Sequence, residues 1–123
     1  MPDVAPSLAP APGDLSAEDT KLLTLARSAR ARVAALEGAA VRDGDGRTYT
    51  GVTIALPSFG LSALQLAVAV AVAAGAVTLE AAALVTEAST LNSADAVAVR
   101  HLSASAPIYL ADATGQAFAV LQP

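Results

Sequence analysis

The sequence predicts a single α/β domain built as a three-layer α/β/α sandwich, with helices on both faces of a mixed sheet of about five strands. Two observations support this class. The 123-residue chain is 54% hydrophobic and 15% charged, which is enough apolar material for one core and argues against disorder over most of its length. Its segments follow the order helix, strand, strand, helix, strand, helix, strand, strand, and helices interspersed with single strands indicate a sheet covered on both sides.

The chain begins with an expected tail and a first helix. Residues 1–13 contain four prolines and no apolar period, so we expect a disordered Pro/Ala-rich tail followed by one domain over residues 14–123. Ser16 is a suitable N-cap, and apolar residues at helical spacing follow it as far as Leu36. We expect Gly38 to end this helix.

A hairpin follows. Two β-prone runs at 39–42 and 47–54 flank the Asp-Gly pairs at 43–46, which is typical of a hairpin turn. The Asp-x-Asp-Gly fragment within it is similar to the start of a calcium loop, but the remainder of such a loop, including its later Glu ligand, is absent. We therefore interpret Asp43 as a turn residue, and Asp112 in the same way.

The most apolar stretch covers residues 61–75, and no charged residue occurs between Arg47 and Glu80. We expect a buried central helix in this stretch. A membrane span is the alternative, but the uninterrupted apolar run covers only residues 66–77 and has no basic or aromatic flanks. The sequence therefore favours a domain that does not cross a membrane.

The C-terminal part predicts one more helix and the remaining strands. The run 79–86 is ambiguous between helix and strand, and we interpret its second half as a buried strand. Asn92 or Ser93 caps a short helix over 94–102. Strands follow at 107–111 and 116–121, with a turn between them.

Composition excludes several kinds of function. The chain has no cysteine and one histidine, so cysteine-ligated metal sites and sites needing two histidines are excluded. A net charge of −4 and the absence of tryptophan argue against nucleic-acid binding. The only histidine, His101, lies late in a helix, where a cation near the C-terminal dipole is the simpler interpretation. We expect a cytoplasmic protein, and its alanine- and arginine-rich composition is typical of bacteria with GC-rich genomes.

Four segments resemble, in register, the small cytidine deaminases. The run GAAVRDGDGRTYTGV at 38–52 is similar to the family's glycine-led first hairpin, and SFGLS at 58–62 to the entry of its first catalytic helix. PIYLAD at 107–112, followed by Gly115, resembles a late strand and turn, and LQP at 121–123 resembles the end of that domain. The resemblance covers residues 15–123 and implies the family's α/β/α fold.

The resemblance also implies where zinc and the proton-transferring Glu would lie. The family's Cys-Ala-Glu motif falls on residues 64–66, where Leu64 cannot bind zinc and Leu66 cannot transfer a proton. The Cys-x-x-Cys motif falls on residues 92–95, where Asn92 and Asp95 offer isolated oxygens that do not complete a zinc site.

The sugar-binding Asn and Glu of the family fall on Thr53 and Ala55. We therefore expect no catalytic or substrate-binding residues of the family type, no metal and no cofactor. Mostly apolar groups replace the family's polar ones, which suggests a pocket converted into core, since polar groups without partners there would cost stability.

These observations predict a catalytically inactive cytidine deaminase-like protein with a structural, regulatory or interaction role. The alternative is a binding module that keeps a nucleoside-like or other small-molecule pocket, and an enzyme is a third interpretation. A domain of this size cannot easily bury every side of an alanine-rich helix that has no charged face. We therefore expect a homo-oligomer, a dimer or tetramer, as the resemblance to the family also implies. An unknown protein partner fits the same role.

Overall fold

A six-stranded mixed sheet forms the centre of the molecule, in the order β1-β8-β7-β6-β2-β3. The computed structural model describes residues 5–123. Among the described strands, β6 and β7 run parallel, and the other neighbouring pairs of this sheet run antiparallel. The strands are β1 Ala9–Pro10, β2 Gly38–Asp43, β3 Thr48–Val52, β6 Leu79–Val85, β7 Ile108–Ala111 and β8 Ala117–Leu121. The predicted α/β class and mixed sheet are confirmed.

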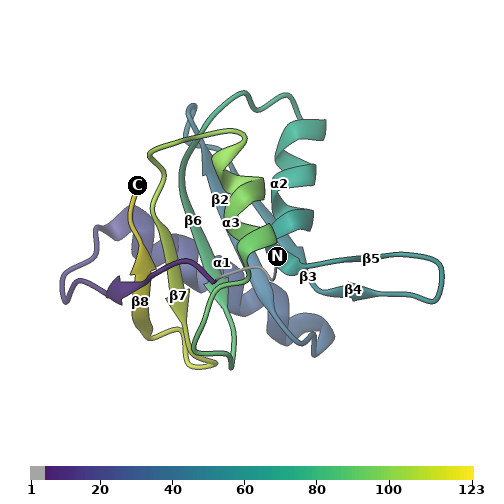
Figure 1. Ribbon diagram of the computed structural model, residues 1–123, viewed down its shortest axis with the longest axis horizontal. Helices are drawn as coiled ribbons and strands as arrows, with labels where there is room; N and C mark the ends of the chain where they lie inside the picture. Colours follow the sequence, from purple (N-terminus) through teal and green to yellow (C-terminus); the bar gives the residue numbers. More distant parts are fainter. Residues whose placement is uncertain (1–4) are drawn as a thin grey trace.

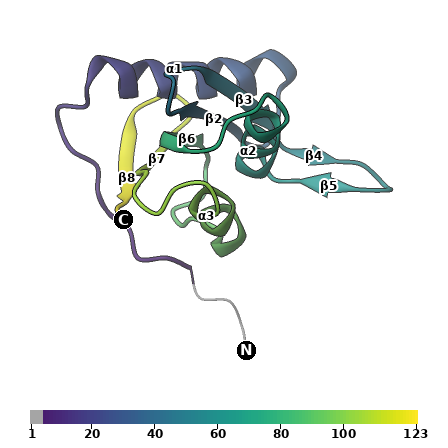
Figure 2. The same cartoon turned by 90° about the horizontal axis from the view of Figure 1, so that it is seen from above.

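The helices form the two outer layers. Helix α1, Ala17–Val33, covers one face of the sheet, while α2, Ala63–Ala73, and α3, Ser93–Arg100, cover the other (Figure 1, Figure 2). Because successive side chains of a strand point to opposite faces, the sheet supplies two cores. Val41, Leu84 and Leu110 pack under α2 and α3, whereas their neighbours in the strands pack under α1.

The end of α1 differs from the expectation. The helix ends at Val33, with Ala34 as a left-handed C-cap, and Gly38 instead begins β2. A side chain at position 38 would meet the carbonyl oxygen of Ala26 at 2.3 Å, so this glycine allows strand and helix to approach closely. Arg30 Nε donates to the carbonyl oxygens of Ala35 and Leu36 beyond the helix end. Val33, the last residue of the helix, and Leu36, beyond it, are both exposed.

The two predicted turns are confirmed. Asp43 Oδ1 accepts hydrogen bonds from the backbone N–H groups of Asp45 and Arg47. Asp112 Oδ1 accepts from the N–H groups of Thr114 and Gln116 in the same manner. Each carboxylate thus binds the backbone of its own loop, which is the usual role of Asp in a tight turn.

The strand predicted in the second half of 79–86 is shorter than the observed one. The whole segment Leu79–Val85 forms β6, because it pairs with β2 on one side and β7 on the other. In the segment expected as a tail, residues 9–10 pair with β8 and add β1, which is why the sheet has six strands. Residues 1–4 of that expected tail lie outside the described part of the chain.

Helix α2 is shorter than the apolar stretch that predicted it, and it is buried on one side. Ala63, Leu64, Ala67 and Ala71 face the core, while Val70 and Val72 are exposed. Before it, β4, Ile54–Ala55, and β5, Gly60–Leu61, form a separate hairpin that projects from the body (Figure 1). Within residues 5–123, no helix is long and apolar enough to cross a membrane.

Candidate functional site

The N-terminal ends of α2 and α3 meet at a cavity of about 440 Å³. Its polar side chains come from the segment before β2, the start of α2 and the loop that leads into α3. Apolar side chains from these segments, from β6 and from the N-terminal segment before β1 complete its wall. The lining residues are Ala5, Leu36, Glu37, Ser62, Leu84, Ala88, Thr90, Leu91, Asn92, Ser93 and Asp95. No basic side chain of the described residues lines this cavity, so its charge comes from two carboxylates.

Ser62 and Asp95 connect the two helix ends. Ser62 is the N-cap of α2, and its Oγ accepts from the N–H of Gln65 at 3.1 Å. The same hydroxyl donates to Asp95 Oδ1 at 2.5 Å. Asp95 lies in the first turn of α3, where the helix dipole favours an acid. Burial raises the pKa of the Asp95 carboxyl, and the hydrogen bond from Ser62 opposes that rise.

Glu37 occupies another part of the cavity wall. Thr86, which is buried at the end of β6, donates from Oγ1 to Glu37 Oε2 at 2.5 Å. The Glu37 backbone N–H donates to Thr53 Oγ1 at 3.0 Å, and the Thr53 N–H donates back to the Glu37 carbonyl oxygen at 3.2 Å. Two threonines therefore hold Glu37 beside the cavity: Thr53, just after β3, binds its backbone, and Thr86, just after β6, binds its carboxylate.

The structure separates the positions that the sequence placed in one site. Asn92 and Asp95 both line the cavity, and Thr53 supports it through Glu37. Leu64 is fully buried in the core between α2 and the sheet. Leu66 lines a different depression, at the β3 edge of the sheet, and Ala55 is exposed on β4.

Glu37 and Ser62 line the cavity and Thr86 binds Glu37, and none of the three was among the predicted site residues. Ser62 carried a local signal, since a Ser three residues before Gln65 matches a capping box. Glu37 and Thr86 are 49 residues apart, and only the pairing of β2 with β6 brings them together. A lone Glu before a strand gives no indication of such a partner.

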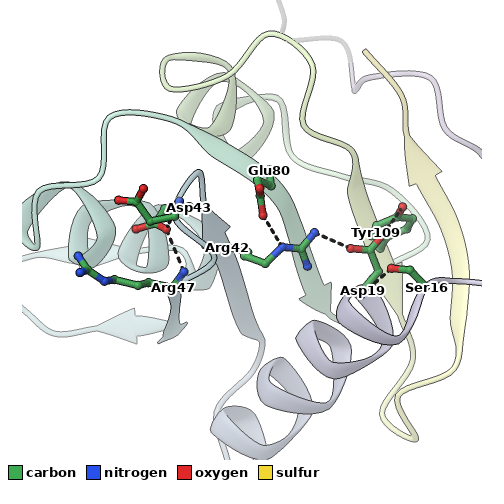
Figure 3. Close-up of polar contacts among 8 residues, drawn as sticks. Ser16, Asp19, Arg42, Asp43, Arg47, Glu80 and Tyr109 are labelled. Atoms are coloured by element: carbon green, nitrogen blue, oxygen red, sulfur yellow. Dashed lines mark hydrogen bonds and ion pairs between the residues drawn. The ribbon is translucent and has the colours of Figure 1, made fainter.

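A second polar cluster lies on the α1 face of the sheet (Figure 3). Arg42 Nη2 pairs with Asp19 Oδ1 at 2.9 Å, and its Nε pairs with Glu80 Oε1 at 2.8 Å. The Tyr109 hydroxyl donates to Asp19 Oδ2 at 2.9 Å. This cluster connects the first turn of α1 to three strands of the sheet, and its contacts point to a role in packing.

The comparisons with known proteins agree with this architecture. The model of the cytidine deaminase-like family matches residues 15–115. The chain therefore belongs to the cytidine deaminase-like family. A comparison with curated protein sequences finds no match.

Two solved structures share the fold. Cytidine deaminase from Burkholderia pseudomallei superposes with a TM-score of 0.73 at 21% identity, over 88% of this chain and 93% of that chain. A point mutant of cytidine deaminase from Mycobacterium tuberculosis gives a TM-score of 0.61 at 26% identity, over 77% of this chain and 85% of that one. These similarities show the fold of the chain.

The side chains at the cavity do not fit the zinc ion that the family resemblance implies. A protein zinc site needs at least three suitable ligands. Leu64 has no ligand atom, and the Asp95 carboxylate already accepts a hydrogen bond from the Ser62 hydroxyl. Across residues 5–123, no three His, Asp or Glu side chains lie close enough together to hold a metal ion.

Proposed function

We propose that this chain is a catalytically inactive member of its family, with a structural, regulatory or interaction role in the cytoplasm. The observation that supports the proposal is the position of Leu64 and Leu66. Zinc-dependent deamination needs a metal that lowers the pKa of bound water and a Glu that moves protons to the base. Leu64 lies in the core and Leu66 lines a separate depression at the β3 edge, and neither alkyl side chain can supply a zinc ligand or a proton carrier.

A zinc and turnover assay tests this proposal. The full chain is incubated with zinc, its metal content is measured after gel filtration, and cytidine loss is followed by absorbance. We expect no zinc retained in proportion to protein and no cytidine loss above buffer. One zinc per chain, together with turnover that a chelator abolishes, would contradict the proposal.

A small-molecule binding role is the second candidate, and the cavity between α2 and α3 favours it. A volume of about 440 Å³ is that of an ordinary ligand pocket, which typically measures about 300–1,000 Å³. A ligand that binds only the native state raises its melting temperature by mass action. A thermal-shift panel of nucleosides, nucleobases and nucleotides tests this role. A saturable shift without turnover supports it, and no shift across the panel argues against a nucleoside-like ligand.

We also propose that the chain forms a homo-oligomer, a dimer or a tetramer. Val70 and Val72 are exposed on α2, and Leu56 and Phe59 are exposed on the projecting hairpin. Exposed apolar groups on an uncharged surface are typical of a protein contact. Light scattering during size-exclusion chromatography should give a multiple of the chain mass. A stable monomer would instead leave these side chains for a different protein partner.

A further inference from the structure

The two carboxylates of the cavity between α2 and α3 share an incomplete hydrogen-bonding pattern. Asp95 uses Oδ1 to accept from Ser62, and Glu37 uses Oε2 to accept from Thr86. Within residues 5–123, no donor reaches Asp95 Oδ2 or Glu37 Oε1. Both hydroxyl partners already donate their protons, so they cannot serve these remaining oxygens.

Asp95 is the stronger indication of a ligand. The residue is 3% exposed, yet its second oxygen is not among the fully enclosed polar atoms without a partner. Since Asp95 lines the cavity, that oxygen is open to it. A buried carboxylate oxygen without a protein donor costs free energy unless water or a ligand supplies the donor.

The charge balance of the cavity favours a cationic donor. Each helix N-terminus contributes a partial charge of about +0.5, so α2 and α3 together contribute about +1. Two ionised carboxylates contribute −2, and no described basic side chain lines the wall. A net charge near −1 remains, which one ammonium group would balance.

We propose that this cavity binds a small organic molecule through a protonated primary amino group, held by Asp95 and Glu37, with its apolar part against the exposed side chains of Leu36 and Ala88. The inference rests on the second candidate function, because it requires a pocket that accepts small molecules. An ammonium group has three donors, which suits two acceptor oxygens and the surrounding hydroxyl and amide groups. A hydrogen bond between two charged groups is also stronger than a neutral one.

Paired probes test the amino group itself. Benzylamine and n-butylamine are titrated into the full chain at pH 7.5 by calorimetry and by backbone NMR shifts, each beside the alcohol of the same shape. We expect saturable binding of at least one amine, with shifts at residues 37, 62 and 95, and about tenfold weaker binding of its alcohol. Benzyltrimethylammonium, which has the charge but no N–H donor, should bind as weakly as the alcohol.

Three variants test the residues. Asp95→Asn and Glu37→Gln each remove one charge from the cavity and should weaken amine binding about tenfold. Glu87→Gln removes the same charge from an exposed side chain outside the cavity and should change the affinity less than about twofold. Circular dichroism and the melting temperature of each variant verify its fold before binding is measured.

Three results would overturn the proposal: no saturable amine binding, equal affinity for amine and alcohol, or affinity that both cavity variants leave unchanged. Zinc-dependent cytidine turnover would overturn the inactive assignment, whatever the amines do. A nucleoside shift without amine binding would retain a small-molecule pocket and reject the amine as its ligand.

Discussion

Ser62 Oγ donates a 2.5 Å hydrogen bond to Asp95 Oδ1 across the gap between two helix N-termini. The same hydroxyl caps α2, and the same carboxylate lies in the first turn of α3. One contact between residues 33 positions apart therefore determines how the two helices of this layer begin relative to one another. Both residues also line the cavity.

Replacement of this serine should cost more than the loss of an ordinary cap. Ser62→Ala removes the acceptor for the Gln65 N–H and the donor for buried Asp95. A lost N-cap costs about 1 kcal/mol, and a buried carboxylate left without its partner adds about 1–3 kcal/mol. We expect a loss of about 2–4 kcal/mol in the free energy of unfolding, measured by urea denaturation.

Ser16→Ala is the matched control for this loss. Ser16 is the N-cap of α1, its Oγ accepts from the Asp19 N–H at 3.1 Å, and the site is exposed. We expect about 1 kcal/mol from this change alone. Equal losses for the two variants would mean that the contact with Asp95 adds nothing.

Asp95→Asn should stabilise the protein at neutral pH. Burial raises the pKa of Asp95 above its ordinary value of 3.8, so the unfolded chain releases this proton first as pH rises. The free energy that the protonated Asp95 carboxyl contributes to folding is fully present below its pKa in the unfolded chain. It is lost as pH rises through its pKa in the folded protein. Asparagine has no charge to desolvate, so the variant avoids this loss.

Urea denaturation of both proteins across the pH range measures the difference. The variant should have the larger free energy of unfolding at pH 7, and the difference should disappear below about pH 3.8. A less stable variant at pH 7 would show instead that the native site favours the ionised carboxylate.

Two glycines set how closely the helices approach the sheet. A Cβ at Gly38 would lie 2.3 Å from the Ala26 carbonyl oxygen, and one at Gly51 would lie 2.5 Å from the Ala63 carbonyl oxygen. Backbone atoms on both sides leave no flexible group to move, so Gly38→Ala and Gly51→Ala should each cost about 2–4 kcal/mol in urea denaturation. Gly13→Ala, with nothing within 4 Å of its Cβ, should change stability by less than about 0.5 kcal/mol.

The Tyr109 hydroxyl should lose its proton at a higher pH than an ordinary tyrosine does. Burial and the hydrogen bond to Asp19 raise the pKa of Tyr109 to about 12. In a Tyr49→Phe background, absorbance at about 295 nm reports Tyr109 alone, since the chain has two tyrosines. Asp19→Asn should lower this pKa by removing the negative charge, while burial should still hold it above 10.0.

Stability linked to Tyr109 should be present at lower pH and fall as pH rises from 10.0 toward about 12, because the folded state retains the proton longer. Asp43→Asn is the control, since Asp43 accepts from the other tyrosine, Tyr49. It should leave the Tyr109 titration unchanged. A Tyr109 pKa near 10 in the Tyr49→Phe protein would contradict both the burial of this hydroxyl and its contact with Asp19.

The parts of the fold that depend on residues close together in the sequence could be predicted. The Asp43 turn, the Asn92 cap and the apolar position of Leu64 follow from local spacing and residue type. The same spacing extended the first helix to Gly38, because periodicity alone does not show where a helix must stop to admit a strand. It also left half of β6 unassigned, since an alanine-rich run suits a helix or a buried strand equally.

The amino-acid sequence by itself determined the α/β class and the order of the main helices and strands, and it predicted that the positions resembling the family's zinc motifs carry no complete ligand set. Only the tertiary structure decided that Glu37 meets Thr86 and that Asp95 meets Ser62, leaving two carboxylates at one cavity. The reason is physical: turns, caps and periodicity act over a few residues, whereas these pairs are 49 and 33 residues apart. Such residues can interact only after sheet pairing and helix packing have brought them together.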